Sequence, residues 1–199
     1  MKSIVSHLPD LPTLVTARLI LRKMTLDDAE DMFAYASDQE VTKHVTWEPH
    51  ITIEDSRAFL LDVLERYEKR LPANWGVELK ATAQLVGTCG FMSWFSDHRR
   101  AEIGFALGHR YWGQGLMTEA VRQVIHWGFN ECNLNRIEGE CKPENVRSAR
   151  VMEKCGMTLE GVLRQSVFAK GQYHDLRLYS ILRQEWQCSD DVFSRKARH

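Results

Sequence analysis

The chain has 199 residues, with 26 basic and 27 acidic side chains and a formal net charge of −1. That length fits one domain with a sizeable core, and the balanced charge gives no basic field for nucleic acid or an anionic membrane. No apolar run approaches a membrane span, and the first residues, MKSIVSHLPDLP, lack the charged-then-apolar order of a signal peptide. We therefore expect neither a nucleic-acid nor a membrane partner.

Cysteine and histidine spacing argues against a disulfide framework and against a metal centre. The five cysteines are odd in number and form no Cys-x-x-Cys pair. This usage favours reduced thiols in a cytoplasm. The eight histidines show no metal-binding spacing, so no metal is expected.

The N-terminal part predicts a short strand at 18–22 and then two helices. Both helices should start at a capping box, Thr25 to Asp28 and Thr52 to Asp55, because a hydroxyl precedes a carboxylate by three residues and an apolar stripe at helical spacing follows. Residues 41–50, VTKHVTWEPH, have no regular period. With Trp47 they form either a plain connector or the aromatic wall of a cleft.

The remaining elements alternate between strands and helices. Strands are predicted at 75–80, 84–94, 101–107 and 136–141, helices from 117 and within 143–156, and two final strands over 158–186. Asn145 should cap the second of these helices and Gly156 should end it, whereas the last residues should fray. The order predicts a mixed α/β (α+β) domain around one sheet of about seven strands.

The segment WGQGLMT, residues 112–118, joins a predicted strand to a predicted helix. Two glycines before a helix start let the backbone approach a phosphate with free N–H groups, although such glycines also form simple tight turns. No Gly-Lys-Ser/Thr follows, which excludes a Walker loop, and Thr118 stands where a dinucleotide fingerprint has its third glycine. Glu138 on the next strand keeps a nucleotide-binding oxidoreductase as the second interpretation.

Several phrases in fixed order resemble the GNAT superfamily of N-acetyltransferases, and within it the RimJ/RimL-type branch, the ribosomal-protein-alanine acetyltransferase-like proteins. They are TARLILRKMTLDDAEDMFAYASD, RAEIGFALGHRYWGQGLMTEA, and RIEGECKPENVRSARVMEKCGMTLEGVLR followed by YHDLRLYSILRQEW. The resemblance covers about residues 16–186. It implies one N-acetyltransferase domain over 1–199, with the sheet splayed at an acetyl-CoA site.

The resemblance also implies which residues hold acetyl-CoA. One backbone segment would pair with the pantetheine amides, the glycine loop would hold the pyrophosphate, and Asn145 would bond to the pantetheine arm, cap its helix, or both. The cofactor-binding set is Phe105, Ala106, Leu107, Gly113, Gln114, Gly115, Leu116, Met117, Thr118 and Asn145.

The chain departs from the superfamily pattern in the loop and at the expected proton donor. The usual loop motif begins with Gln or Arg and has Gly or Ala at its sixth place, where this chain has Trp112 and Met117. A second alignment could begin the motif at Arg110, but the distance from the strand 105–107 favours the first. Met152 stands where many relatives carry a tyrosine that protonates the departing thiolate. Ser148, one turn earlier, either serves instead or is a small packing residue.

The general base is less clearly marked. Glu102 is the first candidate because it lies on the cofactor strand, where some relatives place an acid; otherwise it is an exposed carboxylate. His174 and Asp175, in the turn that leads into the last strand, are the second candidates. Other RimJ/RimL-like chains can carry an acid on the sixth strand, but the matching place here, near Val167, is apolar. The Cys141 sulfur is expected near the reactive end of CoA, or else is a buried thiol.

The implied reaction moves an acetyl group from acetyl-CoA to a primary amine. The branch resemblance points to a protein N-terminal α-amine, such as that of a ribosomal protein, and similar chains act on small-molecule amines or antibiotics. Two interpretations from other classes stay open: a non-catalytic acyl-CoA-binding module and the nucleotide-binding oxidoreductase. A homodimer is also open.

Overall fold

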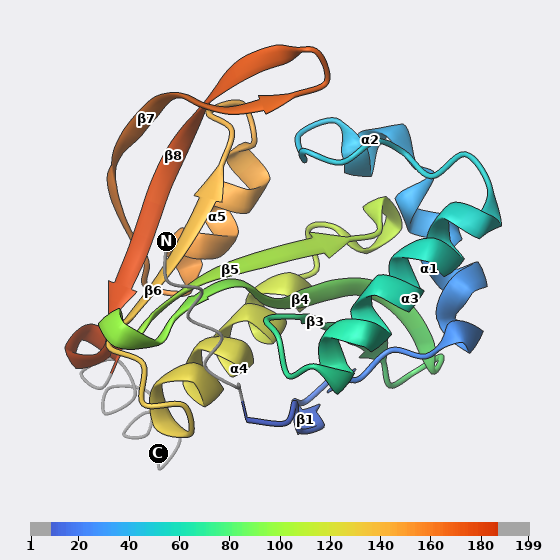
Figure 1. The fold of residues 1–199 in the computed structure, drawn as a ribbon, viewed down its shortest axis with the longest axis horizontal. Helices are drawn as coiled ribbons and strands as arrows, with labels where there is room; N and C mark the ends of the chain where they lie inside the picture. The colour runs from blue at the N-terminus through green and yellow to red at the C-terminus, as the bar shows by residue number, and fades with distance from the viewer. Residues whose placement is uncertain (1–8, 187–199) are drawn as a thin grey trace.

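A computed structural model describes residues 9–186, so the tail expected to fray lies outside the described residues. Its centre is one sheet of eight strands in the order β1-β2-β3-β4-β5-β6-β8-β7 (Figure 1). The mixed α/β fold with one central sheet is thus confirmed. The strand beyond the seven predicted is β1, Leu14–Val15, which is too short to show an alternating pattern.

The first five strands form an antiparallel run. After β1 come β2 (Leu19–Arg22), β3 (Asn74–Leu79), β4 (Gln84–Phe95) and β5 (Arg100–Leu107), each paired antiparallel with the one before it. The sheet continues with β6 (Arg136–Cys141), β8 (Gln172–Leu182) and β7 (Thr158–Ala169).

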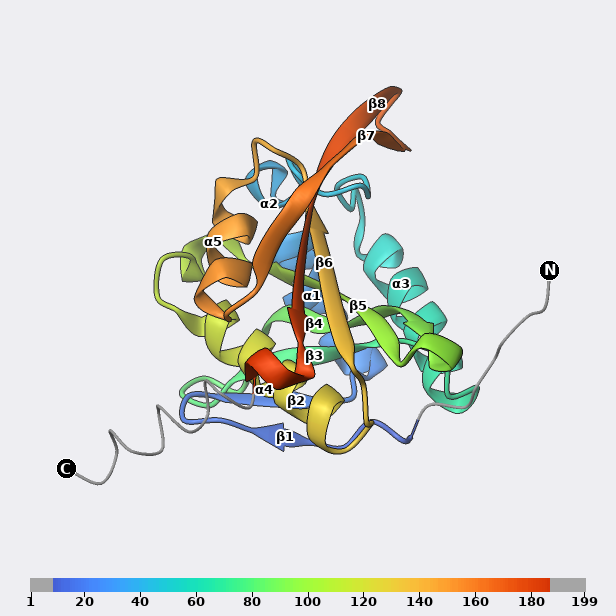
Figure 2. The ribbon, with the colours of Figure 1, turned by 90° about the vertical axis from the view of Figure 1, so that its left-hand side faces the viewer.

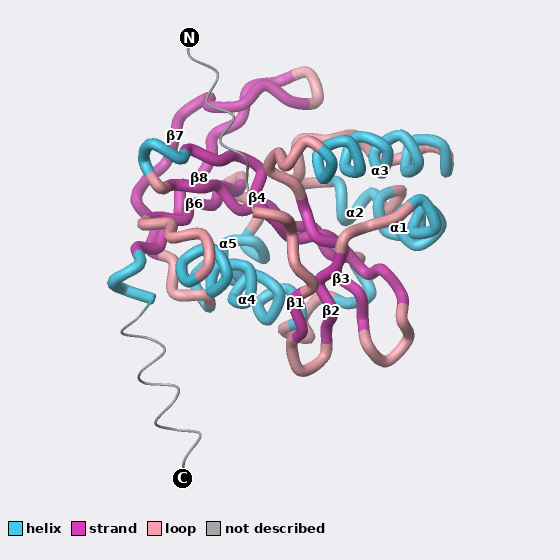
Figure 3. Tube along the Cα trace, turned by 60° about the horizontal axis from the view of Figure 1, so that its bottom comes forward, coloured by secondary structure: helices cyan, strands magenta, loops and turns pink. Residues whose placement is uncertain are grey.

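The helices cover both faces of this sheet (Figures 2 and 3). The 3₁₀ turn η1 (Leu26–Asp28) leads into α1 (Ala29–Ala36), which packs on α3 (Ile53–Glu68) and on β4. On the other face α4 (Leu116–Asn130) packs on β2, β4, β5 and α5 (Val146–Lys154). None of the described helices is long and apolar enough to cross a bilayer.

Local sequence signals set several of the helix boundaries. Both predicted capping boxes are present: Asp28 accepts the Thr25 N–H at 2.8 Å and Asp55 accepts the Thr52 N–H at 2.8 Å. Gly156 follows the last turn of α5 with a φ of +85°. The segment 41–50 differs from expectation, because it begins inside a short helix, α2 (Gln39–Thr42), that Asp38 caps.

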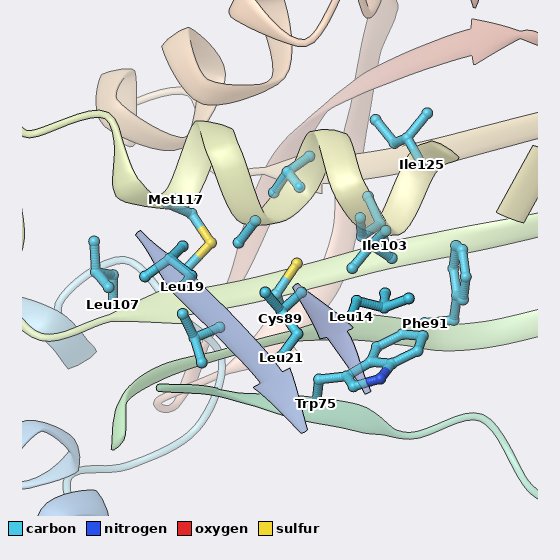
Figure 4. Close-up of a cluster of buried hydrophobic side chains, with 14 of the residues drawn as sticks. Leu14, Leu19, Leu21, Trp75, Cys89, Phe91, Ile103, Leu107, Met117 and Ile125 are labelled. Atoms are coloured by element: carbon cyan, nitrogen blue, oxygen red, sulfur yellow. The ribbon is translucent and has the colours of Figure 1, made fainter. Parts of the chain in front are cut away.

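Buried core side chains lie on both faces of the sheet, and those between α4 and the sheet lie nearest the glycine loop. Figure 4 shows side chains of β1, β2, β3, β4 and β5 meeting the inner face of α4. Trp75 of β3 is fully buried, and its ring meets the edge of Trp127 from α4 at a centroid distance of 5.1 Å. Burial of this face fixes α4 to the sheet and therefore fixes the loop that precedes α4.

The strands β5 and β6 separate near the middle of the sheet. Their parallel pairing covers only three positions, Arg100–Glu102 against Arg136–Glu138. Beyond them β5 stays with β4 as far as Leu107, while β6 stays with β8 as far as Cys141. This is the splay that the resemblance implied. The oxidoreductase interpretation is wrong, since its fold needs a largely parallel, doubly wound sheet.

Candidate active site

A cleft of about 460 Å³ opens where β5 and β6 diverge. It is walled by the end of β5, the glycine loop, the start of α4, one side of α5 and the segment that includes α2. The lining holds every residue of the predicted cofactor-binding set except Gln114. Its volume lies within the range of roughly 300–1,000 Å³ usual for small-molecule sites.

One edge of β5 is free in this cleft. Among residues 9–186, no strand pairs with the β6-facing edge of β5 beyond Glu102, although Phe105 and Ala106 line the cleft there. Backbone groups on such an edge can accept an extended ligand as an additional strand. An amide-bearing chain is the ligand that such an edge suits.

The glycine loop continues this edge into the N-terminus of α4. Gly113 and Gly115 have φ values of +76° and +77°, a region that side-chain-bearing residues rarely adopt. Gly115 is the N-cap of α4, and no side chain in the described part of the chain caps the helix there. The first N–H groups of α4 are therefore free for an anion, and the helix dipole favours one.

Trp112 fixes the loop against the end of β5. Its indole Nε1 donates to the Leu107 carbonyl at 2.7 Å, and the Arg147 guanidinium lies 4.5 Å from the ring centroid. Trp112 lines the cleft, whereas Arg110, which opens the competing frame, does not. The unusual tryptophan thus has a structural role of its own.

Basic side chains of α5 form a wall of the cleft that sequence reasoning missed. Arg147, Arg150 and Lys154 all line it. Their spacing of three and four residues places them on one side of the helix. That spacing was the signal available in the sequence, and the charges favour an anionic ligand.

Asn145 and Ser148 lie at the start of α5, where they line the cleft together. The Asn145 side-chain oxygen accepts the Ser148 backbone N–H at 3.1 Å, so it caps the helix as predicted. Its amide NH₂ donates to no group among residues 9–186. The Ser148 hydroxyl has no hydrogen-bond partner among the described residues.

Comparison with known proteins agrees with this geometry. Residues 18–158 match the family model described as an acetyltransferase (GNAT) domain. The uncharacterized N-acetyltransferase p20 of Bacillus licheniformis is 37% identical over 176 residues, covering 88% of this chain and 99% of its own. A GNAT-family acetyltransferase structure from Bacillus anthracis is 33% identical with a TM-score of 0.77, covering 87% of this chain and 99% of its own.

The chain is an N-acetyltransferase of the GNAT family. A shorter match connects it to the ribosomal-protein-serine acetyltransferase of Escherichia coli, which is 32% identical over 97 residues, or 49% of this chain and 54% of that one. Membership makes the chain an acetyl-CoA-dependent acyltransferase. The interpretation as a non-catalytic binding module is thereby replaced.

In this GNAT chain Glu102 does not line the cleft. Its neighbours Ala101 and Ile103 point into the core and Glu102 alternates with them. The carboxylate accepts the Ser93 hydroxyl at 3.0 Å, and Glu138 lies opposite on β6, bonded to Arg136 at 2.6 Å. Glu102 thus belongs to a polar network beside the splay.

Glu140 is the next carboxylate on that face of β6, and sequence reasoning missed it. It follows Glu138 by two residues, just past the end of the paired segment. Burial, with further contributions from Glu102 and Glu138, raises the pKa of the Glu140 carboxyl. Alternation along β6 would have placed it there once the pairing with β5 was known.

The second candidate bases lie at the start of β8 and bond to groups outside the cleft lining. The His174 Nε2 lies 3.2 Å from Lys142 Nζ and 3.1 Å from the Ala169 carbonyl. The Asp175 carboxylate accepts the Gln165 backbone N–H at 2.8 Å. Neither side chain lines the cleft.

Two sulfur-bearing residues lie beneath the site. Met152 is buried, and its Sδ lies 2.8 Å from where a side chain on Gly139 would begin, so it fills the space over β6. Cys141 is buried and absent from the cleft lining. Burial raises the pKa of its thiol to about 11. The thiol therefore packs like a small hydrophobic side chain.

The segment 41–50, which begins in α2, does form a cleft wall, through residues other than its tryptophan. Val41, His44 and Val45 line the cleft, while Trp47 packs against the core. Burial, followed by the charge of Lys43, lowers the pKa of His44. Within the described residues there is no cluster of side chains suited to a metal.

Proposed function

We propose that this chain transfers the acetyl group of acetyl-CoA to the N-terminal α-amine of a protein. The observation that carries the proposal is the free edge of β5 leading to the uncapped N-terminus of α4. An extended arm with amide groups suits the first, and a pyrophosphate suits the second. The pantetheine and pyrophosphate of acetyl-CoA have this order and chemistry.

The cofactor residues follow from that placement. The backbone of Phe105 to Leu107 pairs with the pantetheine, and the N–H groups of residues 113–118 bind the pyrophosphate. Asn145 caps α5 with its oxygen and donates its amide to the pantetheine arm, a division of roles that its hydrogen bond to Ser148 supports. Arg147, Arg150 and Lys154 add positive charge beside the nucleotide end.

The thioester then lies near the splay, between Ser148 and the polar network of the opposite face. The neutral amine nitrogen attacks the thioester carbonyl carbon, and a C–N bond forms. Glu102, directly or through water, takes the proton that the amine loses. The C–S bond breaks, and the departing thiolate takes the proton of the Ser148 hydroxyl while that hydroxyl takes one from a solvent water. The proton on Glu102 returns to solvent, which closes the proton balance. Free backbone N–H groups of β5 stabilise the tetrahedral oxyanion.

A protein N-terminus is supported as the acceptor by the similarity to the ribosomal-protein-serine acetyltransferase. An α-amine has a pKa near 8, about 2.5 units below that of lysine, so more of it is neutral at physiological pH. Such an acceptor needs less help from a base than a lysine side chain does. This fits a site whose candidate base, Glu102, does not line the cleft.

The test is turnover of acetyl-CoA with a panel of amines. Short peptides with free N-termini, beginning with Ser or Ala, are compared with the same peptides blocked at the N-terminus and with small-molecule amines. Free thiol release gives the rate and mass spectrometry gives the acetylated atom. Transfer to free but not blocked peptides supports the proposal. Turnover of small amines alone would make the chain a small-molecule acetyltransferase instead.

A further inference from the structure

Behind the glycine loop, on the side away from the cleft, lies an ion pair that the mechanism does not use. Arg18, in the turn that enters β2, reaches Glu119 in the first turn of α4, with 2.7 Å between Nη2 and the carboxylate. Arg18 and Glu119 do not line the cleft. They are 101 residues apart in the chain, so only the fold brings them together.

The Glu119 carboxylate is held from several directions. It accepts the Thr16 hydroxyl at 2.6 Å, the Arg18 backbone N–H at 2.9 Å and the Arg18 Nε at 2.8 Å. Burial alone would raise the pKa of Glu119, but these hydrogen bonds outweigh it and the pKa is lowered. Glu119 is therefore charged at neutral pH, about one helical turn from the proposed phosphate site.

The turn that carries Arg18 is itself anchored to the sheet. The Arg18 carbonyl accepts the Lys80 backbone N–H at 3.0 Å, just past the end of β3. Thr16 closes the same turn through its hydroxyl, which accepts the Leu19 N–H at 3.0 Å. The guanidinium thus projects from a fixed point of the fold.

Arg18 also contacts the glycine loop directly. Its Nη1 donates to the Gln114 carbonyl at 2.9 Å, and its Nη2 lies 3.7 Å from where a side chain on Gly115 would begin. A trans peptide is planar, so a carbonyl turned toward Arg18 turns the Gly115 N–H the opposite way. Gln114 is the predicted cofactor residue that does not line the cleft, and its carbonyl is bonded to Arg18, which does not line the cleft either.

We propose that Arg18 is a positioning residue for the CoA pyrophosphate. It holds the Gln114 carbonyl behind the loop so that the Gly115 N–H faces the cleft. It also neutralises Glu119, whose charge would otherwise repel a phosphate at the start of α4. This inference rests on the proposed placement of CoA.

The test is calorimetric titration of CoA into four proteins: the unchanged chain, Arg18→Ala, the double variant Arg18→Ala with Glu119→Ala, and Arg57→Ala. Arg57 is the control because its side chain is about as exposed as that of Arg18, 51% against 48%, and it pairs with Glu54 on α3, outside the cleft lining. Thermal unfolding of each protein is measured in parallel. We expect Arg18→Ala to raise the Kd for CoA about tenfold or more, and Arg57→Ala to leave it unchanged.

The double variant separates positioning from mere stability. It loses more contacts than Arg18→Ala and should unfold at a lower temperature, yet bind CoA several-fold more tightly than Arg18→Ala because the repelling charge is gone. Affinity that falls in step with the unfolding temperature would overturn the proposal, as would a Kd for Arg18→Ala within twofold of the unchanged chain. If the unchanged chain binds no CoA, the proposed function fails first.

Discussion

On the α5 side of β5 the cleft is lined by three stretches of the chain, within residues 40–45, 105–118 and 145–154. On the other side of the same strand, the polar network draws its side chains from β4, β5, β6 and β8, among them Ser93, Glu102, Glu138 and Ser180. The hydrogen-bond donors of the cleft are set by backbone conformation, since glycines and a helix N-terminus supply them. The polar network is set by strand pairing, which brings together carboxylates from distant parts of the chain. Cofactor binding and proton transfer should therefore respond to different substitutions.

The largest expected effect is on the network side. Glu102→Gln should lower kcat by about 10²-fold, the lower end of what a general base contributes. The loss should be greatest at low pH, because the acceptor amine is mostly protonated there and its deprotonation limits the rate. The measurement is kcat against pH with the best acceptor. Glu140→Gln, on the same face, is the matched control, and a larger loss there would move the base to Glu140.

Ser148→Ala tests the cleft side of proton transfer. We expect kcat to fall about tenfold to a hundredfold with the Kd for CoA within twofold of the unchanged chain, since the hydroxyl acts in the transition state while the cap uses the backbone N–H. Steady-state kinetics and calorimetry give the two values. Near-normal turnover in both Ser148→Ala and Glu102→Gln would mean that protons move through solvent and that positioning dominates catalysis.

Gly115→Val should affect binding rather than chemistry. A β-branched residue at a φ of +77° strains the loop, so CoA affinity should fall at least tenfold, about 1.4 kcal/mol. Gly171→Val is the matched control, because Gly171 has the same φ of +77° in the β7–β8 turn. Calorimetry that finds equal CoA affinity in both variants would remove the phosphate from this loop.

The smallest effect is expected at Cys141. A thiol with a pKa of about 11 is almost entirely protonated at neutral pH, so alkylating reagents should label it slowly. Bound CoA should not change that rate, and Cys141→Ala should leave turnover within twofold. Labelling is followed by mass spectrometry of the Cys141 peptide. Protection by CoA would place the sulfur beside the cofactor after all.

Much of the fold could be read from the sequence because its signals are local. The capping boxes at Thr25 and Thr52, the Asn145 cap and the Gly156 stop each act over a few residues, and the structure has all four. The glycine loop is equally local, and its positive φ values need only glycine. β1 and α2 were missed because two and four residues carry too little periodicity.

Neighbours in the chain set the order of elements and the loop before α4, because backbone conformation is local, and the family resemblance marked the residues of β5 that line the cleft. Which charges meet was set by the packing of distant segments. It placed Arg18 behind the loop, Glu140 beside Glu102 and the cations of α5 across from the glycines. The physical reason is that electrostatic partners are set by distance in space, which depends on strand register and helix packing over the whole sheet.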